Sequence, residues 1–197
     1  MKLLGFFLII ATFPLGILIA VCLVLINGLP ILFRQKRVGK DGKIFTMYKF
    51  RTMRLGAVRE QKNLKEINES VGPTFKIRDD PRFTSIGKFL SHTGLDELPQ
   101  LWNVLRGEMA LIGPRPLPVA EEKKLKSWMK KRHSVLPGII SPAILTGSYH
   151  SNFDAWMKSD VSYALKKNII SDIKLFFQAV ALLFRLFARE LRYALRY

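Results

Sequence analysis

The chain opens with a long apolar run and then changes character. The 24 residues from Leu3 to Ile26 are almost continuously apolar, and no charged residue occurs between Leu3 and Phe33. As one straight helix this run would be about 36 Å long, which is enough to span the hydrocarbon core of a bilayer. The pattern therefore predicts a membrane helix within residues 1–33, and a plain transmembrane anchor is its simplest interpretation.

A proline in the middle of the apolar run supports an alternative. Pro14 lacks a backbone donor and clashes with the carbonyl of Ile10, so a kink is expected. Each half is then about 17–18 Å long, which is too short to cross the bilayer core. A re-entrant helix, which enters and leaves by one membrane face, is therefore the second interpretation. Under the positive-inside rule, the cations that follow the run place the next segment on the cytoplasmic side: Arg34, Lys36, Arg37 and Lys40.

Two β-prone stretches, 31–37 and 43–51, flank the sequence Gly-Lys-Asp-Gly at 39–42. An Asp-Gly pair between such stretches predicts a β-hairpin. Within the second stretch, Lys49 and Arg51 alternate with Tyr48 and Phe50, so both cations are expected on one face. Taken alone, this pair is typical of a solvated strand face.

Three later segments have recognisable polarity patterns. Residues 54–72 are polar and of mixed charge, which predicts a surface helix or loop. Residues 121–132 form a basic amphipathic stretch with Leu125, Trp128 and Met129 on its apolar side, and this pattern fits a membrane interface and core packing equally well. Residues 171–197 predict a long helix with a wide apolar face and flanking arginines. That helix is too charged to span a membrane and is expected to lie among anionic headgroups.

The stretch from Thr93 to Pro118 carries the candidate chemistry. Thr93 and Asp96 fit a capping pattern, Pro99 is tolerated only in a first turn, and Gly107 is a plausible stop. We therefore predict a helix that begins near residues 95–97, with Asp96 at its positively polarised end, where a carboxylate stays ionised.

An arginine follows this predicted helix. Arg115 stands between Pro114 and Pro116, which restrict the backbone and help to aim the guanidinium. A fixed carboxylate and a fixed arginine suggest phosphoryl chemistry. For Asp96 and Glu97 alone, however, ordinary helix capping is the simpler interpretation.

The overall charge narrows the classes of partner. The 197 residues carry a formal net charge of +17, which suits nucleic acid, anionic lipid or phosphorylated substrates. The aromatic residues form no recognisable nucleic-acid motif, and the apolar N-terminal run favours the membrane. We therefore propose no nucleic-acid partner. The single cysteine, Cys22, excludes an internal disulfide. The three histidines lack metal-ligand spacing, so no zinc site is proposed.

Several motifs occur in a fixed order. They are Tyr-Lys-Phe-Arg-Thr-Met at 48–53, Asp-Asp-Pro-Arg-Phe-Thr at 79–84, Gly-Lys at 87–88, Leu-Asp-Glu-Leu-Pro-Gln-Leu at 95–101, Asn-Val-Leu-Arg-Gly at 103–107 and Gly-Pro-Arg-Pro at 113–116. In these motifs the chain closely resembles the bacterial sugar transferases of the monotopic phosphoglycosyl transferase family, in its minimal single-domain form. The resemblance covers roughly residues 14–183 and is most specific between residues 49 and 116.

The resemblance implies a fold and a location. The fold would be α+β and mainly helical, with a re-entrant membrane helix kinked at Pro14, a small β-hairpin, a catalytic helix and interfacial amphipathic helices. Residues 1–33 would be embedded in the membrane. Residues 34–197, ending in the amphipathic helix from about 171, would form a catalytic domain on the cytoplasmic face of the bacterial inner membrane.

The resemblance also implies a reaction. A sugar-1-phosphate would pass from a nucleotide diphosphate sugar, a UDP-sugar, to polyprenyl phosphate. Asp96 would be the nucleophile and a Mg²⁺ contact, and Glu97 the general base. The cations expected to bind substrate phosphates are Arg51, Arg115, Lys49 and Arg37.

The chain departs from the family pattern at several places, of which three concern single residues with a clear chemical difference. Ser91 and Ser148 stand where the family usually has arginine, and Phe13 precedes Pro14 where the family has serine. Thr12 is the neighbouring hydroxyl that would replace that serine. Two other functions stay open: a non-catalytic binder of anionic membranes, and a hydrolase of nucleotide sugars. The sequence does not specify the sugar, the polyprenol length, the pathway or the oligomeric state.

Overall fold

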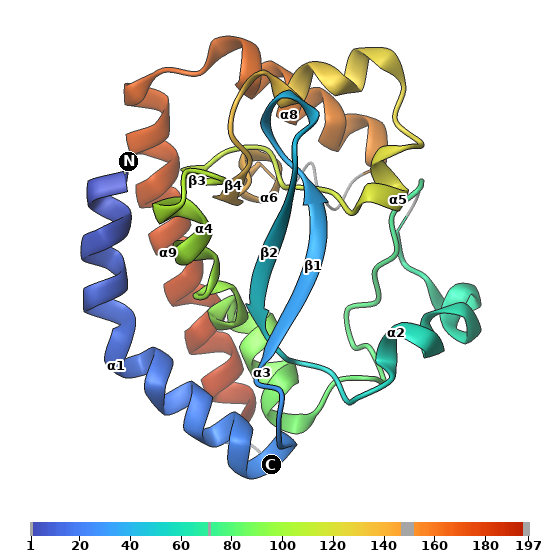
Figure 1. The fold of residues 1–197 in the computed structure, drawn as a ribbon, viewed down its shortest axis with the longest axis vertical. Coiled ribbons are helices and arrows are strands. Elements are labelled where there is room, and N and C mark those ends of the chain that lie inside the picture. The colour runs from blue at the N-terminus through green and yellow to red at the C-terminus, as the bar shows by residue number, and fades with distance from the viewer. Residues whose placement is uncertain (1, 71, 147–151, 195–197) are drawn as a thin grey trace.

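The computed structural model describes residues 2–70, 72–146 and 152–194. In the described residues, helices dominate and the named strands form two separate two-stranded sheets. Figure 1 shows the hairpin of β1 and β2 at the centre, with α1, α4 and α9 on one side and α2 on the other. This architecture confirms the predicted α+β, mainly helical fold with an N-terminal membrane helix. In chain order the elements are α1 (Lys2–Asn27), β1 (Leu32–Val38), η1 (Lys40–Gly42), β2 (Ile44–Phe50), α2 (Ala57–Glu60), η2 (Gln61–Ile67), α3 (Ser85–Thr93), η3 (Leu95–Glu97), α4 (Gln100–Leu105), β3 (Ala110–Ile112), α5 (Val119–Glu122), η4 (Ser127–Ser134), β4 (Gly138–Ile140), α6 (Pro142–Leu145), α8 (Phe153–Lys166) and α9 (Ile169–Ala194).

The N-terminal apolar run forms one helix, α1, that is long and apolar enough to cross a membrane. Pro14 lies inside it, and Figure 1 shows the helix changing direction near its middle, as a proline predicts. The hydroxyl of Thr12 donates to the carbonyl of Leu8 at 2.7 Å, rather than to the Ile10 carbonyl that Pro14 frees. Thr12 therefore does not satisfy the freed carbonyl.

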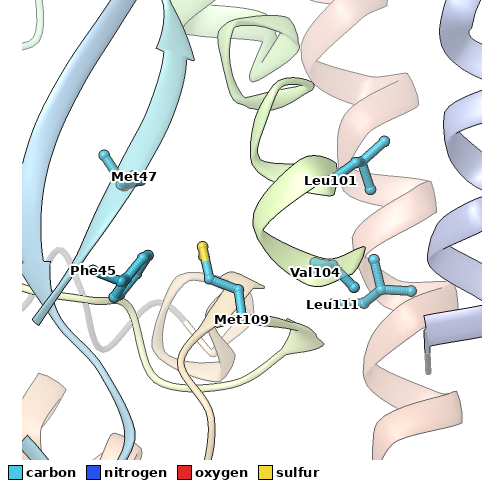
Figure 2. Packing of buried hydrophobic residues seen from close by; sticks show 6 residues of the cluster. All are labelled: Phe45, Met47, Leu101, Val104, Met109 and Leu111. Atoms are coloured by element: carbon cyan, nitrogen blue, oxygen red, sulfur yellow. The ribbon is translucent and has the colours of Figure 1, made fainter. Parts of the chain in front are cut away.

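Both halves of α1 pack on the rest of the protein. Leu8 and Ile9, in the first half, lie against a core cluster formed by β2, α4, β3 and the turn before β3. Ile19 and Leu23, in the second half, are buried in another cluster with residues of β2 and α3. Only 11% of the most apolar stretch of α1 is buried inside the protein. The rest of this stretch is available for contact with lipid. Figure 2 shows the first cluster: Phe45, Met47, Leu101, Val104, Met109 and Leu111.

The predicted hairpin is confirmed. β1 and β2 pair antiparallel from Leu32 opposite Phe50 to Val38 opposite Ile44. The connection contains Asp41 at φ 55° and Gly42 at φ 75°, the left-handed conformations that the Asp-Gly pair favours. The hairpin therefore gives Lys49 a defined place, one residue before the end of β2.

A glycine brings α3 against the chain that leaves the hairpin. Thr84 caps α3 by accepting a hydrogen bond from the N–H of Gly87 at 3.1 Å. A Cβ atom on Gly87 would lie 1.8 Å from the carbonyl oxygen of Thr52, so no larger residue fits at this approach. This contact fixes the position of the turn that follows α3.

The stretch 121–132 packs in the core. Leu125 and Met129 are buried in a cluster with Leu117, Ala143, Trp156 and Met157, and Trp128 packs against that cluster. Core packing is therefore the correct interpretation of this amphipathic pattern, and the interfacial one is wrong. Close by, β3 pairs in parallel with β4, a contact that the sequence did not predict.

The predicted C-terminal helix is present as α9 and begins two residues earlier than expected. Phe187 packs edge-to-face on Phe89 of α3, with ring centroids 5.9 Å apart, and Ala179 is buried. A stripe on its other side is exposed, and by helical spacing Lys174, Arg185 and Arg192 lie beside it. The exposed apolar residues of α9 include Ile169, Ile170, Ile173, Phe177, Phe184 and Leu191.

Candidate active site

The two candidate catalytic carboxylates lie on a single 3-10 turn, η3, between α3 and α4. Gly94, at φ 75°, ends α3 and redirects the chain, and the N–H of Glu97 then bonds to the carbonyl of Gly94 at 3.1 Å. Thr93 is the last residue of α3, and its hydroxyl bonds to the Phe89 carbonyl at 2.8 Å. The predicted cap by Thr93 is therefore wrong, because the left-handed Gly94 separates Thr93 from the turn. Helical structure does begin at Leu95, as predicted, but as the 3-10 turn η3 that leads into α4 at Gln100.

Lys49 holds both carboxylates. On β2 it shares a strand face with Phe45 and Met47, which belong to the core cluster that also contains Leu101 of α4 (Figure 2). Its Nζ atom lies 3.1 Å from Oδ2 of Asp96 and 2.6 Å from Oε1 of Glu97. This cation of the hairpin is thus in direct contact with the Asp-Glu pair, which the sequence did not predict.

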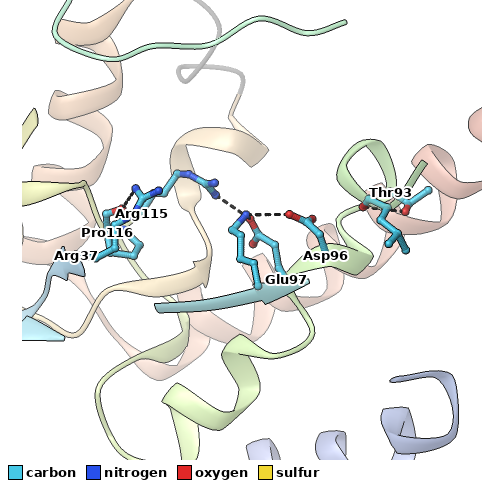
Figure 3. A network of polar contacts seen from close by, with 8 residues as sticks. Arg37, Thr93, Asp96, Glu97, Arg115 and Pro116 are labelled. Atoms are coloured by element: carbon cyan, nitrogen blue, oxygen red, sulfur yellow. Dashed lines mark hydrogen bonds and ion pairs between the residues drawn. The ribbon is translucent and has the colours of Figure 1, made fainter. Parts of the chain in front are cut away.

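Arg115 reaches the same carboxylates from the other side. Its Nη1 atom donates to Oε1 of Glu97 at 3.2 Å, so Glu97 accepts from two cations (Figure 3). Asp96, Glu97, Lys49 and Arg115 come from three separate parts of the chain. The sequence prediction that the Gly-Pro-Arg-Pro loop meets the Asp-Glu turn is therefore supported by this geometry.

Arg37 supports this loop. Its Nη1 atom donates to the carbonyl of Pro116 at 2.8 Å, and the N–H of Val38 donates to the carbonyl of Leu117 at 3.0 Å. Figure 3 shows Arg37 next to Pro116, on the side of Arg115 away from the carboxylates. In this state Arg37 positions the loop, and its predicted contact with substrate phosphate stays a prediction.

Arg51 lies elsewhere. Its Nη2 atom donates to the carbonyls of Asn27 and Gly28, at the C-terminal end of α1, the second of them at 2.7 Å. Its side chain is buried, and a cation there complements the negative end of the helix dipole. The structure therefore gives Arg51 the role of joining the membrane helix to the hairpin, and it does not bring Arg51 to the carboxylates.

The two carboxylates differ in their electrostatic environment. Burial raises the pKa of Asp96, and the neighbouring ammonium of Lys49 opposes this effect. Burial also disfavours the charged form of Glu97, but Lys49 and Arg115 together outweigh it and lower the pKa of Glu97 to about 2. Glu97 is thus ionised whenever both cations contact it.

A buried ion pair behind the loop was missed by sequence reasoning. Nη2 of Arg132, in η4, lies 2.6 Å from Oδ2 of Asp160, in α8, and both side chains are almost fully buried. The same Nη2 donates to the backbone carbonyl of Arg115. The available signal was a carboxylate at position 160 on the side of α8 that also carries Trp156, Met157 and Tyr163.

Other predicted features lie away from the carboxylates. His92 contacts α9: its Nδ1 atom lies 3.5 Å from Oε2 of Glu190. Its Nε2 atom lies 3.0 Å from the carbonyl oxygen of Arg78. No contact joins His92 to Asp96 among the described residues. Ser91 lies in α3, and Ser148 lies outside the described residues.

A sequence model of the family described as "Bacterial sugar transferase" matches residues 2–186. The chain belongs to the bacterial sugar transferase family. This sugar transferase is 46% identical over 150 residues to the galactosyl transferase CpsE of Streptococcus agalactiae serotype III (strain NEM316), covering 76% of this chain and 33% of that protein.

Two other relatives carry names that state an acceptor. The undecaprenyl-phosphate galactose phosphotransferase of Salmonella typhimurium is 33% identical over 81% of this chain and 34% of its own length. The UDP-glucose:undecaprenyl-phosphate glucose-1-phosphate transferase of Escherichia coli (strain K12) is 35% identical over 85% of this chain and 35% of its own. This sugar transferase thus spans about a third of the length of these curated relatives.

Proposed function

We propose that this sugar transferase moves a sugar-1-phosphate from a nucleotide diphosphate sugar, a UDP-sugar, to polyprenyl phosphate. The products are a polyprenyl diphosphate-linked sugar and a nucleoside monophosphate. The observation that carries the proposal is the convergence of Lys49 and Arg115 on the Asp96–Glu97 turn. Two anions and two cations at one turn fit a site where a carboxylate attacks a phosphorus atom and cations offset phosphate charge.

In the first step, Asp96 attacks the sugar-linked phosphorus of the donor. A bond forms between its Oδ atom and phosphorus, and the bond from phosphorus to the bridging oxygen breaks. The nucleoside monophosphate leaves with that electron pair, and the sugar phosphate stays on Asp96. Lys49 and Arg115 stabilise the charge that spreads over the phosphate oxygens. Both cations already contact negatively charged carboxylate oxygens, and phosphate oxygens carry the same sign of charge.

In the second step, an oxygen of the polyprenyl phosphate attacks the phosphorus carried by Asp96. The bond from phosphorus to the Oδ atom of Asp96 breaks, and Asp96 leaves as the free carboxylate. Glu97, with its pKa held at about 2, is a weak base while Lys49 and Arg115 both contact it. A substrate phosphate competes for these cations, and their withdrawal raises the pKa of Glu97 toward its ordinary value. Glu97 then orients or deprotonates the acceptor, so its role as base depends on substrate binding.

Magnesium fits the same carboxylates. Mg²⁺ is usually held by one or two carboxylates together with substrate phosphates, and Asp96 and Glu97 supply that number. The described residues contain no cluster of three or more potential metal ligands, so the diphosphate of the donor has to complete the set. When bound there, Mg²⁺ offsets the negative charge of the diphosphate.

The packing of α1 supports a re-entrant membrane helix, and the cations that follow it, such as Arg34 and Lys36, support a place for the domain on the cytoplasmic face of the bacterial inner membrane. A spanning helix would carry one half of α1 away from a domain that lies on one side of the bilayer. Here both halves pack on that domain, through Leu8 and Ile9 and through Ile19 and Leu23. This supports the re-entrant arrangement, with the arginines of α9 at anionic headgroups.

The acceptor tests the function. Purified protein is incubated with Mg²⁺, polyprenyl phosphate and either UDP-galactose or UDP-glucose, and release of UMP is measured. Release that depends on polyprenyl phosphate supports the transferase. Equal release without the acceptor favours the hydrolase, and no release with any UDP-sugar of a wider panel favours the non-catalytic binder.

Lys49→Met is expected to shift the acidic limb of the pH–rate profile to higher pH. Lys49 lowers the pKa of Asp96, so its removal raises that pKa and leaves less nucleophilic carboxylate at a given pH. The measurement is kcat/KM for the donor between about pH 4 and 8. Lys36→Met, at an exposed position on β1, is the matched control, and Lys49→Arg should return the limb toward its original position. An unmoved limb in Lys49→Met would contradict this account of Asp96.

A further inference from the structure

The last helix, α9, touches both of the segments that lead into the candidate active site. It packs against β3 and against α3. β3 ends at Ile112, three residues before Arg115. α3 is followed directly by Gly94, two residues before Asp96. One helix therefore contacts the segment that carries the arginine and the segment that carries the nucleophile.

The contact near the start of α9 runs through a tyrosine. The hydroxyl of Tyr163, in α8, lies 2.6 Å from Oδ1 of Asp172 in the first turn of α9. The same hydroxyl lies 3.2 Å from the carbonyl oxygen of Ile112. Tyr163 is buried, so these two protein oxygens are the acceptors that its hydroxyl proton can reach. Tyr163 thus joins the start of α9 to the end of β3.

The contact in the second half of α9 reaches the residue just before the catalytic turn. A Cβ atom on Gly94 would lie 3.4 Å from Cδ2 of Leu183, so this leucine lies against the open side of the glycine. Four residues later, Phe187 packs on Phe89 of α3, and Glu190 lies beside His92. This half of α9 is therefore fixed along α3 and at its end.

The residues that make these contacts share one face of α9. At about 100° per residue, Asp172, Leu183 and Glu190 fall in a narrow sector of the helix. The exposed apolar residues, such as Phe177 and Phe184, lie on another side, which leaves that side to the membrane. Because a continuous helix has a fixed rise, Asp172 and Leu183 stay about 16 Å apart along its axis. The two contacts cannot separate unless one of them breaks.

A support of this kind matters when substrate is bound. In the structure Arg115 and Glu97 are joined directly, at 3.2 Å. Under the proposed function, the phosphates of the donor replace Glu97 as the partner of Arg115, so this ion pair no longer joins the two segments. The contacts of α9 involve neither side chain and persist when the ion pair is broken.

We propose that α9 keeps Arg115 and Asp96 at their working distance, with Tyr163 and Leu183 as the positioning residues at its two contacts. The inference rests on the proposed function, which gives Arg115 and Asp96 their roles. Tyr163 acts through the backbone that leads to Arg115. Leu183 acts through the backbone that leads to Asp96.

Kinetic double-mutant cycles test the proposal on the full chain in the detergent of the assay. Tyr163→Phe keeps the ring and removes the hydroxyl, and Asp172 retains Lys167, at 3.9 Å, as a partner. This change should lower kcat with UDP-galactose or UDP-glucose, whichever is the active donor, by about tenfold, because a small misplacement of a catalytic group slows the reaction strongly. Asp172→Asn keeps an oxygen acceptor for Tyr163 and should retain most of kcat.

Leu183→Ala should lower kcat by about threefold to tenfold, since it removes the contact with Gly94. The double change of Tyr163→Phe with Leu183→Ala should cost little more than the larger single change, because release of either contact already frees the distance. In an Arg115→Met background, each change should lower kcat by less than about twofold. Leu165→Ala, at an exposed position of α8, is the matched control and should leave kcat unchanged.

Hydrogen exchange followed by mass spectrometry separates positioning from general destabilisation. Tyr163→Phe should speed exchange in residues 110–117, and Leu183→Ala in residues 93–98, by at least about threefold. Exchange in the hairpin of β1 and β2 should stay as in the wild type. Faster exchange throughout the chain would show a general loss of stability and overturn the positioning roles.

The outcomes also separate this inference from the proposed function. Wild-type transfer to polyprenyl phosphate, together with additive effects of Tyr163→Phe and Leu183→Ala, overturns the inference and leaves the function standing. A wild-type protein that transfers nothing, with the expected local changes in exchange, overturns the function. The exchange measurement needs no turnover, so the support that α9 gives to both segments would stand in that case.

Discussion

Replacement of Asp96 by asparagine is expected to abolish transfer, with kcat at least about 10³-fold lower. Asparagine has nearly the shape of aspartate, so the packing of η3 against its neighbours is kept. Its amide cannot form the acyl phosphate that the first step needs. Lys49 keeps Glu97 as a partner at 2.6 Å, so no cation is left unpaired by the change.

The measurement has two readouts. UMP release reports turnover, and mass spectrometry of wild-type protein mixed with donor alone should show one added sugar phosphate on the peptide that contains Asp96. Asp41→Asn, at the exposed tip of the hairpin, is the matched control because asparagine also tolerates the left-handed conformation found there. Full turnover by Asp96→Asn would exclude Asp96 as the nucleophile.

Asp160→Asn is expected to cost about 3–5 kcal/mol of the free energy of unfolding, because it removes the nearer of two carboxylates from the buried guanidinium of Arg132 and leaves only Glu122, at 3.9 Å. At 2–4 °C per kcal/mol for a chain of this size, Tm should fall by roughly 6–20 °C. Transfer should fall as well, since the same guanidinium bonds to the carbonyl of Arg115 and so holds the loop that reaches Glu97.

Thermal unfolding in one detergent, followed by circular dichroism, measures this effect. Asp154→Asn, at an exposed position in the first turn of the same helix, serves as the matched control and should lower Tm only slightly. The double change of Arg132→Met with Asp160→Leu should recover stability but not full activity, because the contact to the Arg115 carbonyl is still missing. A wild-type Tm in Asp160→Asn would show that the ion pair does not stabilise the fold.

Local sequence patterns correctly predicted the elements whose formation depends on residues close together in the chain. The uninterrupted apolar run and its proline specified α1 and its bend, and the Asp-Gly pair between β-prone stretches specified the hairpin. The amphipathic spacing at the C-terminus specified α9. Each of these depends on neighbours within a few residues, which one sequence displays directly.

The prediction that Thr93 caps a helix failed because the same Thr-x-x-Asp spacing also occurs where one helix ends and a new turn begins. Thr93 and Asp96 have the spacing of a capping box, but Gly94 between them adopts the left-handed conformation that ends α3. The Thr93 hydroxyl then bonds back into its own helix. Asp96 is consequently held by Lys49 rather than by the start of a long helix.

Contacts between distant parts of the chain were beyond sequence reasoning from spacing alone. The motifs that resemble the family brought Asp96, Glu97 and Arg115 together in the prediction. In the structure Lys49 contacts both carboxylates, and Arg115 contacts Glu97. No local pattern distinguishes Lys49, which reaches the carboxylates, from Arg51, which ends at α1. The difference arises because Arg51 lies further along the hairpin: its N–H still pairs with the carbonyl of Ile31, and its side chain therefore lies beside the end of α1.

The packing of α1 has a consequence for how the protein matures. Its two halves complete two separate core clusters, and Arg51 ties its last turn to the strand that carries Lys49. The N-terminal helix is therefore a structural part of the core that supports the catalytic turn. Without lipid, a newly made chain would either bury the apolar surface of α1 in non-native contacts or leave the two core clusters without the residues that α1 contributes. Insertion into the bilayer and completion of the active site are thus one folding event.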